Sequence, residues 1–115
     1  MSAEQLHEQK EDLSESVLDA HRAYRTLIEE VEAIDWYNQR AEATDDEKLR
    51  AIFIHNRNEE MEHACMTLEW IRRNESGWHE RMNTYLFKDE TITELEDEEE
   101  SSESRDDLMI GRIRK

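Results

Sequence analysis

Apolar residues recur at helical spacing along the first half of the chain. From about Ser14 to Ala43 they stand three or four positions apart, as on one face of an α-helix, at Val17, Ala20, Tyr24, Leu27, Ile28, Val31 and Ile34. Asp12 or Ser14 can cap the start of this helix through a side-chain oxygen. The pattern therefore predicts one long amphipathic helix over 14–43.

A second helical pattern follows almost at once. Thr44-Asp45-Asp46-Glu47 is typical of a capping box, and the apolar positions after it are Leu49, Ile52, Phe53, Ala64, Leu68 and Ile71. The pattern ends near Arg73 or Asn74, where basic side chains favour a helix C-terminus. Because the connection is so short, the two helices must form an antiparallel hairpin.

The remainder of the chain is less regular. After Gly77, the apolar positions Trp78, Met82, Tyr85 and Leu86 predict a short third helix. Residues 96–107 are almost entirely Glu, Asp and Ser, a composition that cannot bury enough surface to order itself. We therefore divide the chain into a flexible N-terminus (1–13), a helical hairpin domain (14–95), an acidic disordered linker (96–107) and a C-terminal peptide (108–115).

Composition points to an oligomer. The 115 residues are 40% charged and 36% hydrophobic, with a net charge of −16, so a monomer can bury only a thin core. The single cysteine, Cys65, excludes a disulfide framework and suits a reducing cytoplasm. The acidic balance argues against nucleic acid and anionic membranes as partners. We expect no membrane span and no signal peptide, and we expect cations or a basic partner instead.

Glu60 and His63 stand three residues apart in the second helix, so they share one face and can hold a metal ion together. They fall along the apolar stripe, where an unpaired carboxylate is costly to bury. The alternatives are a solvated acidic face and a core histidine satisfied by a backbone carbonyl. Glu4 and His7 repeat the spacing in a polar segment without an apolar stripe, so the motif gains its weight from context.

Glu30 offers a second carboxylate from the first helix, between two apolar positions of that helix. In a hairpin, residues equally far from the turn face each other. Counting outward from Ala43 and Thr44 places Glu30 level with Arg57, less than one turn from Glu60. We therefore expect the two carboxylates to approach one another.

Di-iron carboxylate sites in four-helix bundles use a Glu from each of two helices and a Glu-x-x-His from each of the others. Glu30, Glu60 and His63 are half of that set, on half of such a bundle. We expect an all-α fold in which two-helix antiparallel hairpins, each with a short C-terminal helix, dimerise into a ferritin-like four-helix bundle around a dinuclear iron site. Carboxylate and imidazole ligands suit iron, and the lack of paired cysteines argues against structural zinc.

Several long stretches resemble the signature sequences of encapsulated ferritins: Glu29–Arg40, His55–Ala64, Met66–Asn74 and Thr84–Phe87. The resemblance implies a ferroxidase, which oxidises Fe(II) to Fe(III) with O₂ at a site between two subunits. It implies that Glu30, Glu60 and His63 of both chains are the iron ligands. It also implies that dimers assemble into a ring of ten subunits.

The same resemblance implies three lesser groups around the site: Trp36 and Tyr37 beside it, Glu29 and Glu32 along an acidic approach for the cation, and His55, Glu59 and Glu62 in a weaker outer metal site. By spacing alone, the aromatic pair is typical of interface packing. Both charged groups are equally typical of a solvated helix face.

The tail is apolar and basic, with Leu108, Ile110 and Ile113 placed around Gly111, which suits an extended peptide that docks on another protein. The alternative is a terminus with incidental aliphatic residues. The tail resembles the peptide that targets cargo into encapsulin shells, although Met109 and Arg112 replace the smaller residues more usual there. This implies an encapsulin partner and a location in the lumen of a cytoplasmic nanocompartment, where iron mineral is stored.

Two functions remain open from the sequence. The first is a ferroxidase that delivers iron for storage inside an encapsulin shell. The second is a non-catalytic acidic helical scaffold, recruited by its tail, in which any metal only bridges the dimer. A calcium or zinc buffer is a weaker third. The scaffold explains the charge, the hairpin and the tail, but it does not explain why metal-binding side chains lie on the apolar stripe.

Overall fold

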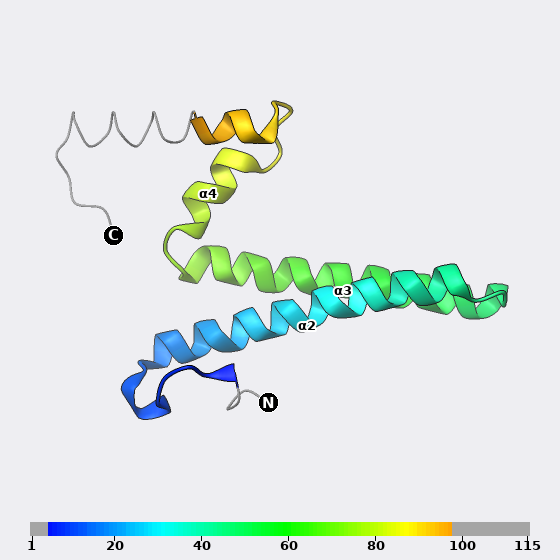
Figure 1. Cartoon of the computed structure of the whole chain (residues 1–115), viewed down its shortest axis with the longest axis horizontal. Helices are drawn as coiled ribbons and strands as arrows, with labels where there is room; N and C mark the ends of the chain where they lie inside the picture. The colour runs from blue at the N-terminus through cyan, green and yellow to red at the C-terminus, as the bar shows by residue number, and fades with distance from the viewer. Residues whose placement is uncertain (1–4, 98–115) are drawn as a thin grey trace. The chain divides into compact units, whose positions relative to one another are not determined.

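A computed structural model describes residues 5–97 of the chain (Figure 1). In chain order its elements are the 3₁₀ turn η1 (Lys10–Asp12), α2 (Glu15–Ala43), α3 (Glu47–Asn74) and α4 (Trp78–Tyr85). Within residues 5–97 there is no strand. The predicted all-α fold, a long hairpin plus a short third helix, is therefore confirmed. None of the helices in the described part of the chain is both long and apolar enough to cross a membrane.

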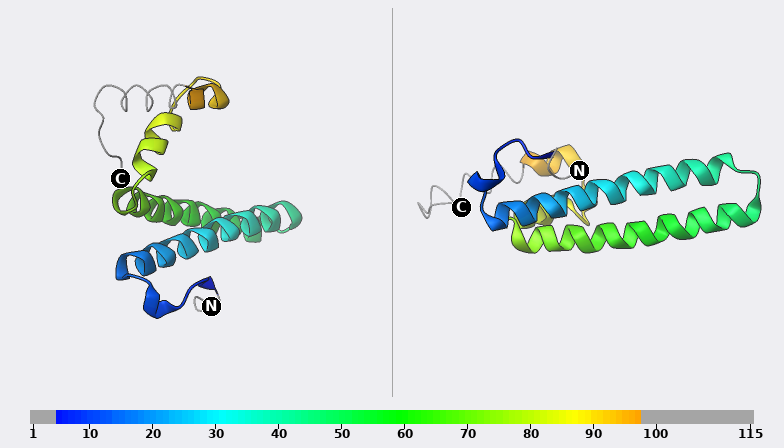
Figure 2. Two further views of the ribbon diagram at one scale, coloured as in Figure 1. Left: turned by 60° about the vertical axis from the view of Figure 1, so that its left-hand side comes forward. Right: turned by 90° about the horizontal axis from the view of Figure 1, so that it is seen from below.

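The two long helices, α2 and α3, lie side by side and run in opposite directions, joined by a short connection at one end (Figures 1 and 2). Ser14 caps the start of α2, because its hydroxyl accepts a hydrogen bond from the backbone N–H of Val17 at 3.2 Å. At the other end, the N–H of Thr44 donates to the carbonyl of Arg40 at 3.1 Å and closes the last turn. The helix therefore begins and ends near the residues that the sequence predicted.

The start of α3 differs from the predicted capping box. Asp46, not Thr44, caps this helix: its carboxylate accepts hydrogen bonds from the N–H groups of Lys48 at 2.9 Å and Leu49 at 3.1 Å. The Thr44 hydroxyl instead accepts from the N–H of Asp46 at 3.1 Å, inside the loop. The reason is positional, since Asp46 directly precedes Glu47, the first residue of α3.

The hairpin has a thin core. Its buried hydrophobic side chains, within the described residues, are Leu18, Ala20, Ala41 and Ile71. Many larger apolar side chains remain exposed along α2 and α3, among them Val17, Ile28, Val31, Ile52, Met61 and Met66. A chain that leaves this much apolar surface in water gains from association with another apolar surface, as the composition predicted.

Among the described residues, 75–97 belong to a second compact unit, distinct from the unit that contains the hairpin. Gly77 precedes α4 with φ = 93°, a left-handed conformation that glycine adopts without strain. Residues 92–97 are helical, so the first two positions of the predicted linker continue a helical turn. The rest of that linker and the whole C-terminal peptide lie outside the described residues.

Candidate metal centre

Three of the predicted ligands lie together between α2 and α3. Glu30 comes from α2, and Glu60 and His63 come from α3. One ligand atom from each residue lies within 4.8 Å of the other two. Among residues 5–97, this is the only group of three or more His, Cys, Asp and Glu side chains that meet in this way.

The geometry inside this triad (Glu30, Glu60 and His63) suits an ion better than a direct bond. His63 Nδ1 lies 3.7 Å from Glu60 Oε1, which is longer than a hydrogen bond. One ion bound at about 2 Å from each of two ligands fits between atoms so separated. The spacing of three residues on one helix makes this approach possible, since both side chains project from the same face.

The register of the hairpin brings Glu30 to the same level. The prediction that Glu30 is level with Arg57 is wrong by about one turn, because the connection centres on Asp45 and not between Ala43 and Thr44. Glu30 and Glu60 lie equally far from Asp45, so they face each other. Arg57 instead donates from Nη1 to Asn38 Oδ1 at 2.9 Å, nearer the turn.

Glu30 carries the clearest sign of an unmet partner. Its Oε1 atom is buried and has no hydrogen-bond partner. Within residues 5–97, the only other buried side-chain nitrogen or oxygen without a partner is Nε2 of His21. A buried acceptor without a partner costs free energy unless a cation or a donor reaches it. The Glu60 and His63 side chains are 28% and 46% exposed, so the triad is open on one side.

This donor set fits a first-row transition metal. Two carboxylate oxygens and one imidazole nitrogen are ligands that iron accepts, and soft thiolate ligands are absent from the triad. Three ligands leave coordination positions free. The open side of the triad is therefore where further ligands, water or a second ion can enter.

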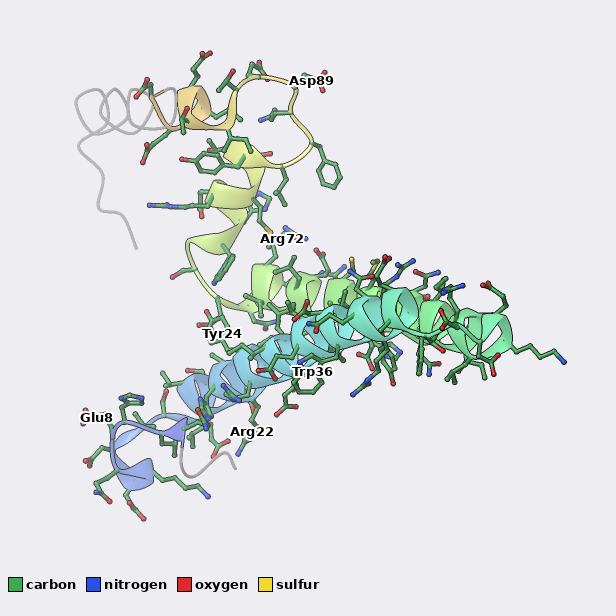
Figure 3. The ribbon with its side chains drawn as sticks, turned by 45° about the vertical axis from the view of Figure 1, so that its right-hand side comes forward. Glu8, Arg22, Tyr24, Trp36, Arg72 and Asp89 are labelled. Atoms are coloured by element: carbon green, nitrogen blue, oxygen red, sulfur yellow. The ribbon has the colours of Figure 1, made fainter. Side chains whose placement is uncertain are left out.

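The two predicted aromatic neighbours differ in their surroundings. Trp36 lies at the surface of α2 and is 49% exposed (Figure 3). The Tyr37 ring is half-buried and packs on the ring of Phe53 across the hairpin, with centroids 6.1 Å apart and planes at 33°. The guanidinium of Arg40 lies 5.4 Å from the centre of the Tyr37 ring. The contact with Phe53 could not be predicted from local spacing, because contacts across a hairpin depend on its register. The contact with Arg40 is local, since Arg40 lies three residues after Tyr37 on α2.

The remaining predicted residues stay outside the triad. All five charged residues of the predicted approach and outer site are exposed: Glu29, Glu32, His55, Glu59 and Glu62. Their exposure is compatible with a route for cations and with a plain solvated surface. The four predicted targeting residues lie outside the described residues: Leu108, Ile110, Gly111 and Ile113.

Comparison with known proteins identifies the family of this chain. The family model described as EncFtn-like matches residues 5–89. The chain belongs to the EncFtn-like family. The resemblance to encapsulated ferritins that the sequence motifs indicated is thereby confirmed.

Two relatives of this EncFtn-like chain are known by name. A Ferritin-like protein of Thermotoga maritima is 49% identical over 113 residues, covering 96% of this chain and 99% of that protein. An Encapsulated ferritin-like protein of Rhodospirillum rubrum is 50% identical over 95 residues, covering 83% and 68%. A crystal structure of a Nitrosomonas europaea protein superimposes with a TM-score of 0.74 at 47% identity, covering 76% of this chain and 96% of that one.

Proposed function

We propose that this protein is a ferroxidase that oxidises Fe(II) to Fe(III) with O₂ at a dinuclear site shared by two subunits. The observation that carries the proposal is the triad of Glu30, Glu60 and His63, with its buried and unpartnered Glu30 oxygen. Membership of the EncFtn-like family supports an iron-related function for this protein. The Fe(II) ions are the substrate.

Two copies of the triad make a complete site. One triad offers three ligands on two helices, which is half of the set found in di-iron four-helix bundles. A two-fold axis that passes beside the open edge of the triad brings two triads together. The number of ligands and the number of helices around the site are then both doubled. The same association covers exposed apolar side chains of both hairpins, so the site and the interface form together.

The residues of the chain have separate tasks in this reaction. Glu30 and Glu60 neutralise the charge of the incoming ions, and the neutral imidazole of His63 donates a nitrogen lone pair. Two Fe(II) ions each lose one electron to O₂, which takes up two protons and leaves as hydrogen peroxide. Carboxylate ligands favour the more highly charged Fe(III) product and thereby the direction of the reaction.

The exposed charged residues serve the supply of iron in this proposal. Glu29 and Glu32 attract cations toward the triad, as an acidic surface raises their local concentration. His55, Glu59 and Glu62 hold a weaker outer ion. Trp36 and Tyr37 support the site through packing beside it. The family resemblance of the stretches that contain these residues is what supports these roles.

An oxidation assay tests the central claim. Fe(II) is added anaerobically to purified protein, O₂ is admitted, and Fe(III) formation and native mass are recorded together. We expect rapid oxidation that saturates near one iron per chain, two per dimer. Glu30→Gln, Glu60→Gln and His63→Ala each lose most of this rate, whereas the matched control Glu42→Gln, on the exposed end of α2, keeps it. Native rates in all three ligand variants would refute the site.

We further propose that the oxidised iron is stored in an encapsulin shell in the cytoplasm. The tail resembles a targeting peptide, and a relative at 50% identity is named an Encapsulated ferritin-like protein. Residues 108–115 then dock in the shell lumen, 96–107 act as a tether, and dimers assemble into a ring of ten. Co-expression with a shell protein tests this: deletion of 108–115 abolishes co-purification, while the native mass of the ring and its iron oxidation are unchanged.

A further inference from the structure

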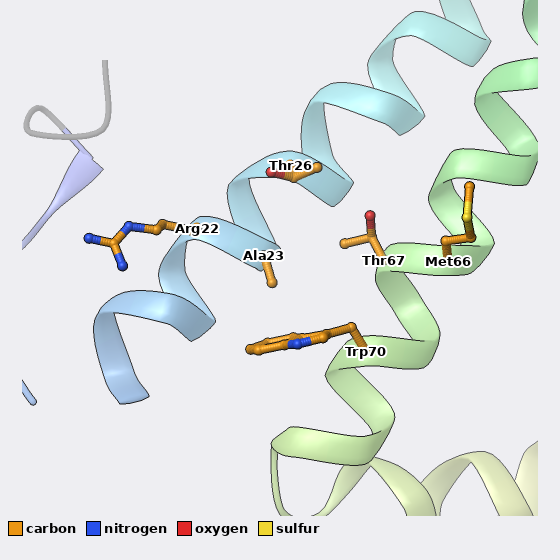
Figure 4. Close-up of a pocket in the computed structure, with 6 residues that line it drawn as sticks. All are labelled: Arg22, Ala23, Thr26, Met66, Thr67 and Trp70. Atoms are coloured by element: carbon orange, nitrogen blue, oxygen red, sulfur yellow. The ribbon is translucent and has the colours of Figure 1, made fainter. Parts of the chain in front are cut away.

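A hollow of about 340 Å³ opens on the hairpin between α2 and α3 (Figure 4). Six side chains line it: Arg22, Ala23, Thr26, Met66, Thr67 and Trp70. Trp70 extends from α3 toward Ala23 on α2, whereas Met66 extends along α3 away from Trp70 (Figure 4). None of the three ligands of the triad is among these side chains, so the hollow is a separate feature of the hairpin.

Apolar groups make up most of the surface of the hollow. The methyl group of Thr67 points toward α2, whereas its hydroxyl points along α3 (Figure 4). The other apolar walls are the methyl, thioether and indole groups of Ala23, Met66 and Trp70. The Arg22 guanidinium points away from the hollow, and its Nη1 lies 2.6 Å from Oδ1 of Asp19 (Figure 4). The hollow therefore offers water few hydrogen-bond partners.

The hollow adjoins the metal centre on the side away from the turn. Thr26 stands four residues before Glu30 on α2. Met66 and Thr67 stand three and four residues after His63 on α3. Residues three or four apart on a helix are neighbours on one face, and a long side chain lies over the turn before its own. The hollow is therefore one helical turn from ligands on both helices, with the Met66 side chain over the turn of His63.

The lining of the hollow does not suit Fe(II). None of the six side chains carries a carboxylate, and the one charged residue, Arg22, is positive. The exposed carboxylates of Glu29 and Glu32 attract a cation instead. A molecule that gains from the hollow is small, uncharged and apolar. In the proposed reaction, the substrate with these properties is O₂.

We propose that the hollow takes up O₂ and supplies it to the metal centre, so that the two substrates reach the triad by separate routes. This inference rests on the proposed function, because it takes O₂ as the oxidant of iron at the triad. Fe(II) arrives over the acidic surface, and O₂ arrives from the apolar side, past Met66. The unbranched Met66 side chain has three rotatable bonds and moves aside for a molecule of this size.

The driving force is the transfer of a small apolar molecule out of water. Such transfer is favourable, and apolar cavities of roughly 150 Å³ in proteins remain dry and take up xenon. A local excess of O₂ beside the triad lowers the O₂ concentration at which oxidation reaches half its maximal rate. The maximal rate itself depends on the iron ligands. The hollow therefore acts on the KM for O₂ and not on kcat.

Filling the hollow tests this route. Ala23→Leu places a larger side chain in it, seven residues from Glu30 and outside the triad. Fe(II) is bound anaerobically, and oxidation is followed by stopped flow over a series of O₂ concentrations. We expect the KM for O₂ to rise about fourfold, the factor that corresponds to burial of one methylene-sized group. The amount of bound Fe(II) and the rate at saturating O₂ stay native. The matched control Ala51→Leu, an exposed change on α3 outside the hollow, keeps the native KM.

A second variant separates the space in the hollow from its polarity. Thr67→Val replaces a hydroxyl with a methyl group of similar size, so the hollow stays open and becomes more apolar. We expect a KM for O₂ at or below the native value. A native KM in Ala23→Leu, or an equal rise in both variants, would overturn the proposal. If Ala23→Leu lowered the native mass and left the KM unchanged, the hollow would belong to a side chain of a second copy instead.

Xenon tests the hollow without any reaction. This apolar atom occupies the same kind of site as O₂, and its anomalous scattering locates it in a crystal. In crystals of the native metal-free protein pressurised with xenon, we expect a peak between Ala23 and Thr67. Ala23→Leu removes that peak, and Ala51→Leu keeps it. Xenon bound only elsewhere on the hairpin, or not at all, would contradict the proposal.

The two proposals fail separately. If xenon fills the hollow but all three ligand variants oxidise iron at the native rate, then the hollow binds apolar gases and the ferroxidase site is wrong. If the ligand variants are inactive and Ala23→Leu keeps the native KM for O₂, then the iron site stands and O₂ arrives by another route.

Discussion

The guanidinium of Arg50 on α3 lies against the last turn of α2, where its Nε donates to the carbonyl oxygen of Ala41 at 2.8 Å. The same side chain donates through Nη2 to the carbonyl of Thr44 and through Nη1 to Glu47. Carbonyls at a helix C-terminus have no partner within the helix, so Arg50 satisfies groups that otherwise need water. One side chain thus joins the end of α2 to the start of α3.

We expect Arg50→Ala to lower the free energy of unfolding by about 1.5–3 kcal/mol, the usual range for hydrogen bonds to a charged group. The Arg50 side chain is only 29% exposed, so solvent replaces these bonds incompletely. The free energy of unfolding of Arg50→Lys should lie between those of Arg50→Ala and the native protein. A single ammonium group lacks the forked geometry of the guanidinium and cannot reach all three acceptors. Thermal melts measure both effects.

The matched control for this change is Lys48→Ala, an exposed cation two residues earlier in the same turn. Its effect should stay within about 0.5 kcal/mol, as for most surface substitutions. Equal melting temperatures for Arg50→Ala and Lys48→Ala would show that the contacts of Arg50 add no stability to the hairpin.

The helices and the hairpin could be predicted from sequence because local spacing determines them. Apolar positions with a period near 3.6, two glycines and no proline leave few alternatives to long helices. The pairing of Glu60 with His63 is also local, so the α3 half of the metal centre followed from the same information.

The contacts that depend on the register of the hairpin could not be predicted to the residue. Whether Asp46 or Thr44 caps α3 shifts the centre of the turn, and with it the residue that faces Glu30. The contact of Tyr37 with Phe53 follows from that register, as does the hollow beside Trp70. Such contacts link residues far apart in sequence, so no local sequence pattern predicts them.

Glu30→Met should stabilise the metal-free protein and remove its response to metal. Methionine nearly matches glutamate in length, and it removes a buried oxygen that has no hydrogen-bond partner. We expect a gain of roughly 1 kcal/mol in the free energy of unfolding without metal, the cost of one unsatisfied acceptor. Fe(II) added anaerobically at about 100 times its Kd should stabilise the native protein by ~2.7 kcal/mol and leave the variant unchanged.

Calorimetric melts with and without Fe(II) measure both parts of this prediction. Glu42→Met, an exposed change on the same helix, serves as the control and should keep the full response to Fe(II). An equal rise in melting temperature for Glu30→Met and the native protein would mean that iron stabilises the fold from another site.

Gly77→Ala should destabilise the protein through its backbone alone. Gly77 has φ = 93°, and a Cβ atom placed there meets no atom within 4 Å beyond the two neighbouring residues of the chain, so contact with the rest of the protein adds no cost. Left-handed backbone costs an L-residue about 1–2 kcal/mol, and asparagine tolerates it better than alanine. Melting temperatures should therefore fall in the order native, Gly77→Asn, Gly77→Ala. The neighbouring change Ser76→Ala is the control, and a Gly77→Ala protein as stable as that control would rule out backbone strain.

Glu69 forms a fork with two guanidinium groups near the end of α3. Arg72 donates to its two oxygens at 2.8 and 2.7 Å, and Arg73 donates at 2.6 Å. The hydrogen bonds from Arg72 and then Arg73 lower the pKa of the Glu69 carboxyl from its ordinary 4.5 to about 2. The charged form is therefore favoured in the folded protein.

A carboxyl whose pKa is lower in the folded state adds stability above its unfolded pKa, and that contribution disappears as the pH falls through the folded value. For Glu69 the contribution is complete above pH 4.5 and declines toward pH 2. Glu69→Gln should consequently melt below the native protein at pH 6, and the gap should close between pH 4.5 and 2. Because these side chains are exposed, salt should narrow the gap at pH 6. Thermal melts of the native protein and Glu69→Gln across this pH range, with Glu42→Gln as the control, test this prediction. A difference in melting temperature that stays constant with pH would show that the ion pairs of Glu69 do not contribute to stability.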